Sequence, residues 1–254
     1  MILLLDIGNT HTRAALAGTQ GLGRQTTLLT RQWFGPQAQA RLTDWVGTAR
    51  LQGAALCSVV PQATPLAQRA LMRRWRLVAL ELTHRTVIGL GINYPKPETI
   101  GPDRLANALA ARHCFGAPVV AADFGTATTV DVVNRQGDFI GGVIAPGLAA
   151  LADYLHDKTA LLPRVKLRQV RRAIGRSTRE AILIGVVRGY RGLVRELLKE
   201  VKRELGCQRV PVVATGGCAR LVAAGLPEIK AVVPELTLTG LRLAWLASQG
   251  LGAA

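Results

Sequence analysis

The chain has 254 residues, enough to bury one large hydrophobic core or two small ones. Its apolar fraction of 49% and its mean hydropathy of +0.23 exclude an intrinsically disordered chain. No apolar run reaches the length of a membrane span. The 32 basic and 16 acidic residues give a net charge of +16, which favours anionic partners such as nucleotides or nucleic acid.

Cysteine usage and the first residues indicate where the protein works. The 4 cysteines are scattered without a C-x-x-C pair, and the 4 histidines form no metal-binding pattern. This composition suits a reducing cytoplasm and argues against a structural zinc site. The first residues lack a charged segment, and Asp6 interrupts their short apolar run, so we expect no secretory signal and a cytoplasmic protein.

The first motif is MILLLDIGNTHTR, an apolar run that ends in an acidic residue, a glycine and hydroxyl residues. It predicts a buried strand that turns at Gly8, where a residue without a side chain turns at the lowest cost. The N–H groups of such a turn, with the side chains of Asn9, Thr10 and Thr12, can form a phosphate cradle. Asp6 can hold a cation or a metal-bound water beside it.

A second motif, VVAADFGTATTVDVV at residues 119–133, repeats the pattern with Asp123, Gly125, Thr126 and Thr128. Taken singly, each motif also fits an ordinary β-hairpin that uses Asp and Gly as turn residues. The repetition at corresponding places predicts two similar halves, 1–117 and 118–254, each presenting an acidic hairpin to one cleft.

The remaining elements predict an α/β fold. In the first half we expect short strands up to residue 30, a helix over 38–51, a strand over 53–60, a helix over 64–75 and a strand over 77–82. An irregular loop over 89–99 and a helix over 100–116 follow. In the second half we expect helices over 149–155, 177–205, 218–224 and 238–248, a basic irregular stretch over 164–176, and a strand over 211–217.

Two residues near the end of the first half have both a structural and a functional interpretation. Tyr94, in the Pro-rich loop, can be a packing anchor or a ligand contact. Asp103 follows Pro102 at a helix start. Proline is common at the first position of a helix, and a negative charge in the first turn is favoured by the helix dipole, so both residues have a structural explanation. A carboxylate at that helix N-terminus could also accept a proton from a substrate hydroxyl, and the helix is expected to keep it ionised and therefore a weak base.

Two features of the second half also have structural explanations. Ser177 and Glu180 fit a capping box at the start of the long helix, which leaves the hydroxyl of Thr178 available for another role. The Gly216-Gly217 turn after a buried strand lets a flat ring or a phosphate approach the backbone. The basic residues are dispersed and are not interleaved with aromatic residues, so we favour a solvated surface over a nucleic-acid-binding face.

Together these motifs resemble the type III pantothenate kinase family, also known as the Bvg accessory factor family. The resemblance runs in order along nearly the whole chain, through the motifs Asp6-x-Gly8-Asn9-Thr10, Tyr94, Gly101-x-Asp103-Arg104, Asp123-Phe124-Gly125-Thr126-Ala127, Gly141-Gly142-x-x-x-Pro146-Gly147 and Thr215-Gly216-Gly217. It implies the fold of the acetate and sugar kinases, Hsp70 and actin, in which two ribonuclease-H-like halves flank a nucleotide cleft. It also implies ATP- and Mg²⁺-dependent phosphorylation of pantothenate to 4′-phosphopantothenate, the first step of coenzyme A biosynthesis.

The resemblance also implies roles for individual residues, a monovalent cation (K⁺ or NH₄⁺) and a homodimer. Asp103 would accept the proton and Asp123 would hold the monovalent cation. ATP would be held by Asp6, Ile7, Gly8, Asn9, Thr10, His11, Thr12, Arg13 and Thr126. Pantothenate would be held by Tyr94, Gly101, Pro102, Asp103, Arg104 and Thr178. Arg13 departs from the lysine that is common in the family, which keeps the charge but changes its geometry.

Other functions are compatible with parts of this pattern. Within the same superfamily, the chain could be a sugar or acetate kinase, or a phosphatase acting on polyphosphate. The charge of +16 also suits a basic nucleic-acid-binding regulator. The third alternative is a relative that binds nucleotide but has no catalytic activity. The presence of all three carboxylates, Asp6, Asp103 and Asp123, argues against it.

Overall fold

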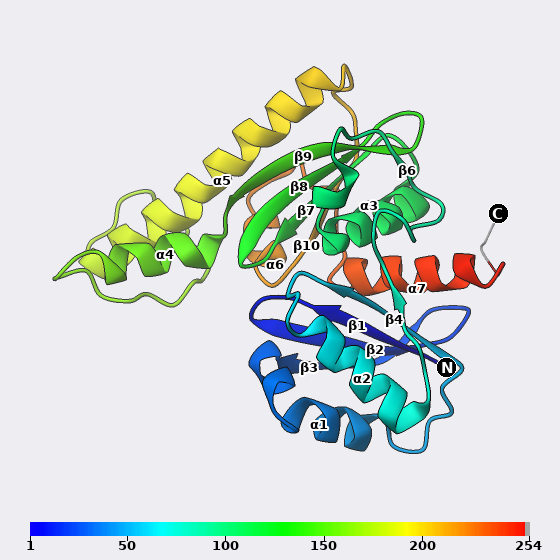
Figure 1. The fold of residues 1–254 in the computed structure, drawn as a ribbon. Helices are drawn as coiled ribbons and strands as arrows, with labels where there is room; N and C mark the ends of the chain where they lie inside the picture. The colour runs from blue at the N-terminus through cyan, green and yellow to red at the C-terminus, as the bar shows by residue number, and fades with distance from the viewer. Residues whose placement is uncertain (252–254) are drawn as a thin grey trace. The chain divides into compact units, whose positions relative to one another are not determined.

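The computed structural model, which describes residues 1–251, consists of two compact units (Figure 1). Unit 1 comprises Met1–Cys114, Gly137–Phe139 and the chain from Glu235 onward, and unit 2 comprises Phe115–Gln136 and Ile140–Pro234. This division by compactness differs from the predicted halves 1–117 and 118–254, which follow the repeated motif, because the last helix packs within unit 1. The halves stay a prediction.

Unit 1 is built on a sheet of five strands in the order β3-β2-β1-β4-β5. β1 pairs antiparallel with β2 and parallel with β4. The bounds are β1 Ile2–Ile7, β2 His11–Ala17, β3 Leu22–Leu29, β4 Gly53–Ser58 and β5 Leu80–Glu81. All six residues of β1 are buried, as expected for a central strand that is covered on both faces.

Helices cover the two faces of this sheet (Figure 1). The helices of unit 1 are η1 Thr30–Phe34, α1 Gln37–Val46, α2 Thr64–Trp75, η2 Pro97–Thr99, α3 Pro102–Phe115 and α7 Leu236–Ser248. α1 and α2 cover one face of the sheet, and α7 covers the other. Leu3, Leu5 and Ile7 of β1 form one core with buried residues of α1 and α2. Because side chains alternate along a strand, Leu4 and Asp6 point to the opposite face, where α7 packs on β1 and β4.

Unit 2 repeats this arrangement of strands. Its sheet runs β11-β10-β7-β8-β9, so that the central strand again pairs antiparallel with the next strand in sequence and parallel with a later one. The bounds are β7 Val119–Phe124, β8 Ala127–Val133, β9 Asp138–Pro146, β10 Val212–Thr215 and β11 Ala231–Val232. β6, which spans Gly91–Ile92, pairs with Asp138 and Phe139 at the start of β9.

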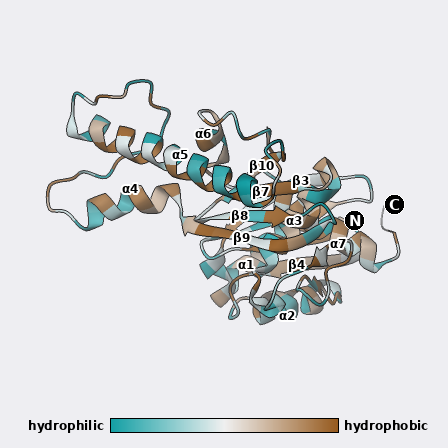
Figure 2. Cartoon of the chain, turned by 90° about the horizontal axis from the view of Figure 1, so that it is seen from above, coloured by the Kyte–Doolittle hydropathy of each residue, from teal (hydrophilic) through white to brown (hydrophobic). Residues whose placement is uncertain are grey.

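The helices of unit 2 are α4 Leu148–Asp157, α5 Thr178–Glu204 and α6 Ala219–Ala223. Their apolar residues join Val120, Ala122 and Phe124 of β7 in one core. Along α5 hydrophilic and hydrophobic residues alternate, as expected for a helix with one buried face (Figure 2). Ser177 caps α5 as predicted, since its hydroxyl accepts a hydrogen bond from the Glu180 N–H over 3.3 Å.

Most predicted elements are confirmed, and three predictions were wrong in extent. The helix predicted over 38–51 ends at Val46, because Gly47 takes φ of +59° and terminates it. The strand predicted over 77–82 has only two residues, Leu80 and Glu81. Residues 89–99, predicted to be irregular, contain β6 and η2. Within residues 1–251, no helix has the length and apolar character needed to cross a membrane.

Candidate functional site

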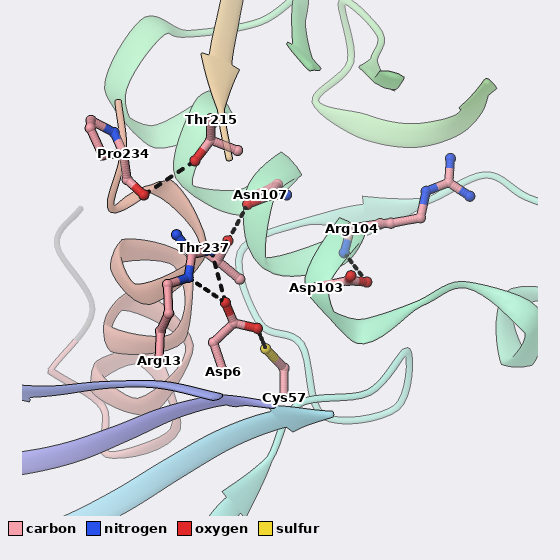
Figure 3. A network of polar contacts seen from close by, with 9 residues as sticks. All are labelled: Asp6, Arg13, Cys57, Asp103, Arg104, Asn107, Thr215, Pro234 and Thr237. Carbon is pink, nitrogen blue, oxygen red and sulfur yellow. Dashed lines mark hydrogen bonds and ion pairs between the residues drawn. The ribbon is translucent and has the colours of Figure 1, made fainter. Parts of the chain in front are cut away.

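The carboxylate of Asp6 lies between two cross-strand neighbours. In the register of unit 1, Asp6 is opposite Arg13 on β2 and opposite Cys57 on β4. Directly opposed residues point to the same face of a sheet, so the strand pairing itself brings these three side chains together (Figure 3). The sequence predicted Asp6 and Arg13 as site residues but did not point to Cys57.

Both oxygen atoms of this carboxylate have a hydrogen-bond donor. Arg13 donates to Oδ2 through Nε over 3.1 Å and through Nη2 over 2.9 Å, and Cys57 Sγ donates to Oδ1 over 3.6 Å (Figure 3). Burial of the Cys57 thiol, followed by the negative charge of Asp6, raises its pKa well above the ordinary value. Cys57 is therefore a neutral thiol that donates a hydrogen bond to Asp6.

Arg13 is in turn connected to two helices. Its Nη2 donates to Thr237 Oγ1 of α7 over 3.2 Å, and Thr237 Oγ1 donates to Asn107 Oδ1 of α3 over 2.9 Å (Figure 3). Thr237 and Asn107 are each 1% exposed. Neither was predicted, because Thr237 lies 224 positions from Arg13 and nothing local distinguishes it from other helical threonines.

The turn after β1 has the predicted form. The Gly8 N–H donates to the His11 carbonyl over 3.0 Å, and Asn9, Thr10 and His11 are exposed. Thr12 instead points into the core of unit 1: Trp33 Nε1 donates to its hydroxyl over 3.0 Å, and this hydroxyl pairs with that of Thr30 over 3.1 Å. The side chains of Thr12 and Ile7 are buried, so an ATP contact by either residue would use its backbone.

Asp103 lies in the first turn of α3, as predicted. Its Oδ1 accepts a hydrogen bond from the Arg104 backbone N–H over 2.8 Å. Burial and then the charge of Asp6 raise the pKa of Asp103, and these effects outweigh the hydrogen bonds at the helix start. The expectation of a weak base held ionised by the helix was therefore wrong in its direction: desolvation makes this carboxylate more basic than an ordinary aspartate.

Gly101 contributes through its lack of a side chain. A Cβ at this position would lie 2.6 Å from Asp103 Oδ1, so the carboxylate occupies the space that a side chain would fill. The position of the Asp103 carboxylate at the start of α3 thus depends on the absence of a side chain at Gly101.

The predicted pantothenate residues Tyr94 and Arg104 meet on one aromatic ring. The Arg104 guanidinium lies 5.5 Å from the centroid of the Phe139 ring, and the Tyr94 ring packs edge-on against it with centroids 6.0 Å apart. Phe139 was not predicted. Packing on Phe139 fixes Tyr94 in the loop, which agrees with the structural interpretation of this residue and also orients it beside Arg104.

The second acidic motif occupies the corresponding place in unit 2. Asp123 on β7 is opposite Thr129 on β8 and Thr215 on β10. In unit 1, the residues at the equivalent positions beside Asp6 are Arg13 and Cys57. The Gly125 N–H donates to the Ala127 carbonyl over 3.1 Å, and Thr126 is exposed at the turn. The two hairpins share their geometry, but the second has no arginine opposite its carboxylate.

Glycines surround this second turn. A Cβ on Gly216, whose φ is +91°, would lie 2.3 Å from Asp123 Oδ1 and 2.7 Å from the Phe124 backbone nitrogen. A Cβ on Gly147 would lie 2.3 Å from the Thr126 carbonyl oxygen. Thr215, just before Gly216, donates to the Pro234 carbonyl over 3.3 Å (Figure 3). The backbone of two segments, at Gly147 and at Gly216, therefore approaches the Asp123 turn closely, which leaves no room for side chains there.

The remaining predicted residue, Thr178, is exposed at the first position of α5 in unit 2. Pro102 begins α3 in unit 1. Within residues 1–251 there is no cluster of three acidic, histidine or cysteine side chains that could hold a metal ion by themselves. Mg²⁺ is commonly held by one or two carboxylates together with substrate phosphates, so the single carboxylate of Asp6 beside the turn fits a phosphate-bound Mg²⁺.

Comparison with known proteins identifies the family. Residues 2–200 match the family model of type III pantothenate kinase. The chain is 43% identical over 243 residues to the type III pantothenate kinase of Akkermansia muciniphila, covering 95% of this chain and 97% of that protein. It is 41% identical to the one from Methylacidiphilum infernorum, covering 95% and 87%.

A solved structure supports the fold. The inorganic polyphosphate/ATP-glucomannokinase of Arthrobacter sp. strain KM superposes with a TM-score of 0.54 at 12% identity, over 98% of each chain. The predicted fold class, that of the sugar kinases with two similar α/β sheets, is confirmed. The chain belongs to the type III pantothenate kinase family.

Proposed function

We propose that this chain transfers the γ-phosphoryl group of ATP to the 4′-hydroxyl of pantothenate, with Asp103 as the proton acceptor. The new bond joins the hydroxyl oxygen to the γ-phosphorus, the bond from that phosphorus to the β–γ bridging oxygen breaks, and ADP leaves. The hydroxyl proton goes to the Asp103 carboxylate. The observation that carries the assignment of Asp103 is its place in the first turn of α3, where its carboxylate occupies the space beside Gly101. Burial raises the pKa of this carboxylate, which makes it a better base than an exposed one.

The ATP phosphates are assigned to the first hairpin turn, and an ATP contact is assigned to Thr126. The exposed turn of residues 8–11 presents backbone N–H groups beside the Asp6–Arg13 pair, and Thr126 lies at the tip of the second turn. When bound, Mg²⁺ would neutralise phosphate charge next to Asp6. Phosphoryl transfer has a loose transition state that depends on positioning and charge neutralisation, and each turn is proposed to contribute to these.

Asp123 is the proposed ligand of a monovalent cation, K⁺ or NH₄⁺. In register, its neighbours are the neutral residues Thr129 and Thr215, whereas Asp6 has an arginine beside it. A carboxylate beside hydroxyl and carbonyl oxygens provides the oxygen ligands that hard cations prefer. The hydroxyl and carbonyl oxygens around the turn add the neutral ligands that a large monovalent ion requires.

Pantothenate is assigned to the start of α3 and to the Tyr94–Phe139–Arg104 contact. The Arg104 guanidinium supplies a positive charge for the pantothenate carboxylate. Thr178 begins α5 in unit 2, and its exposed hydroxyl is assigned to the site of a second copy, so the proposal includes a homodimer. Because ATP and Mg²⁺ are supplied in the cytoplasm, that is the proposed location.

The test is a coupled assay of ADP release with ATP and Mg²⁺, with and without pantothenate, in K⁺ and in Na⁺ buffer. We expect release that depends on pantothenate and falls in Na⁺. Absence of stimulation by pantothenate in either buffer would overturn the assignment of substrate, and equal rates in both buffers would overturn the role of the monovalent cation.

The role of Asp103 is tested by Asp103→Asn in the same assay. Loss of the proton acceptor should lower kcat by about 10²-fold or more while ATP binding is retained. A variant with near-normal turnover would remove Asp103 from this role.

A further inference from the structure

The contacts around Arg13 extend beyond the hairpin that carries it. One edge of the guanidinium, Nε and Nη2, faces Asp6 Oδ2, and Nη2 also reaches Thr237 Oγ1 over 3.2 Å. The Thr237 hydroxyl has a single hydrogen, which it donates to Asn107 Oδ1 over 2.9 Å, so a lone pair faces Arg13. The direction of each hydrogen bond from Asn107 to Asp6 is thereby fixed.

From this chain of contacts we propose that Thr237 and Asn107 are positioning residues, which hold the Arg13 guanidinium on Asp6 and so preorganise the ATP-phosphate turn. The three contacts link β1 and β2 of the sheet to α7 and α3. A guanidinium held at two points loses less freedom when a phosphate or a phosphate-bound cation arrives, because its orientation is already determined.

Burial makes this arrangement stiff. Thr237 and Asn107 are each 1% exposed and the Arg13 side chain is 30% exposed, so the inner part of the chain is dry and its outer end reaches solvent. Polar groups that are buried in this way keep their partners, because an unmade hydrogen bond there is costly. The buried pair Thr237 and Asn107 therefore orients the guanidinium of Arg13, which is accessible to solvent.

Close packing of the two helices supports the same conclusion. On α7, a Cβ at Gly240 would lie 2.0 Å from the Ala106 carbonyl oxygen of α3, one residue before Asn107. On the other side of α7, a Cβ at Gly53 of β4 would lie 2.4 Å from the Trp245 ring. α7 is thus held against both α3 and the sheet, and Thr237 cannot shift far from Arg13.

The inference rests on the proposed function, so its test measures nucleotide binding separately from turnover. Affinity for Mg²⁺·AMPPNP is measured by titration calorimetry without pantothenate, and KM for ATP and for pantothenate by ADP release. Thr237→Val, which removes the hydroxyl but keeps the shape, should weaken nucleotide binding by about tenfold. KM for ATP should rise similarly, and KM for pantothenate should stay within about twofold.

Three further variants separate positioning from a general loss of structure. Thr237→Ser keeps the hydroxyl and should bind nucleotide like the wild type. Thr239→Val makes the same change at a half-buried position two residues along α7 and should also bind normally. In an Arg13→Lys background there is no guanidinium to contact Thr237. Adding Thr237→Val in that background should therefore lower nucleotide affinity by less than twofold.

The proposal is overturned if Thr237→Val binds nucleotide as well as Thr239→Val, or if its loss is as large in the Arg13→Lys background. Where Thr237→Val does not fold, Thr237→Ala takes its place, because it also removes the hydroxyl that contacts Arg13. It should lose affinity, and normal binding would contradict the inference. A wild-type chain that binds AMPPNP but does not phosphorylate pantothenate would overturn the proposed function alone, and one that binds no nucleotide would overturn both.

Discussion

At the scale of single residues, the ionised carboxylate of Asp103 is expected to lower the stability of the folded protein by a measurable amount. Its raised pKa means that the folded protein binds a proton at this carboxylate more tightly than the unfolded chain does. The ionised carboxylate therefore destabilises the fold at neutral pH. We expect Asp103→Asn to raise the melting temperature at pH 7 by about 2–4 °C while it lowers kcat.

The pH dependence distinguishes this cause from others. The destabilisation caused by the Asp103 carboxylate should decrease as pH falls through its raised pKa, so the advantage of Asp103→Asn should disappear below the ordinary pKa of an aspartate. Thermal melts of both proteins between pH 7 and pH 3 measure it. An unchanged or lower melting temperature of the variant at pH 7 would show that the carboxylate is not significantly desolvated.

Gly101 gives a second prediction at this scale. A Cβ there would lie 2.6 Å from Asp103 Oδ1, which is the end of a flexible side chain, so Gly101→Ala should fold with a loss of only about 1 kcal/mol. The displaced carboxylate should lower kcat by about tenfold or more, because catalysis depends on positions to within about 1 Å. Steady-state kinetics and urea unfolding measure the two effects, and unchanged kcat would contradict the prediction.

At the scale of elements, the turn after β10 is the most constrained part of unit 2. Gly216→Ala would set a Cβ 2.7 Å from the Phe124 backbone nitrogen at φ of +91°, where the backbone cannot move without disturbing β7. We expect a loss of about 2–4 kcal/mol in urea unfolding. The matched control is Gly217→Ala, whose Cβ would meet nothing within 4 Å and should change stability little. Equal stability of the two variants would contradict the prediction.

The success of sequence-based prediction differed between elements for physical reasons. α2 was predicted residue for residue, because Pro65 near its start and the apolar spacing are local signals. β5 and β6 are two-residue strands, whose existence depends on pairing with β4 and β9 and not on their own composition. Local patterns determine long amphipathic helices, whereas short edge strands are determined by their partners.

The same distinction holds in the site. Short motifs whose spacing fits a hairpin or a helix start point to Asp6 and Asp103, whereas Arg13 was named through the family resemblance, and the roles of all three stay predictions. Cys57, Asn107, Phe139 and Thr237 could not be predicted, since strand register or the packing of distant helices brings them to the site. The basicity of Asp103 was mispredicted because burial, which the sequence does not reveal, outweighs the helix start.

At the scale of the whole molecule, α5 presents an exposed row of glycines at Gly185, Gly189 and Gly192. The spacing of four and three residues places them on one side of the helix. An added Cβ at any of them would meet nothing within 4 Å in the described part of the chain. Each exposed helical glycine costs about 1 kcal/mol relative to alanine, and close approach of a second chain to α5 would account for this cost.

We therefore expect the proposed homodimer to use this side of α5, where Leu193 is also exposed. Gly189→Leu places a bulky side chain in the row and should convert the dimer to a monomer in sedimentation equilibrium, while helix content is unchanged. Gly21→Leu is the control, because an added Cβ at this turn position also meets nothing within 4 Å but lies in unit 1. If Gly189→Leu stays dimeric, or if the wild type is monomeric at micromolar concentration, the glycine row has another cause. The loss of dimer should also abolish pantothenate turnover, since Thr178 at the start of the same helix is assigned to the second copy.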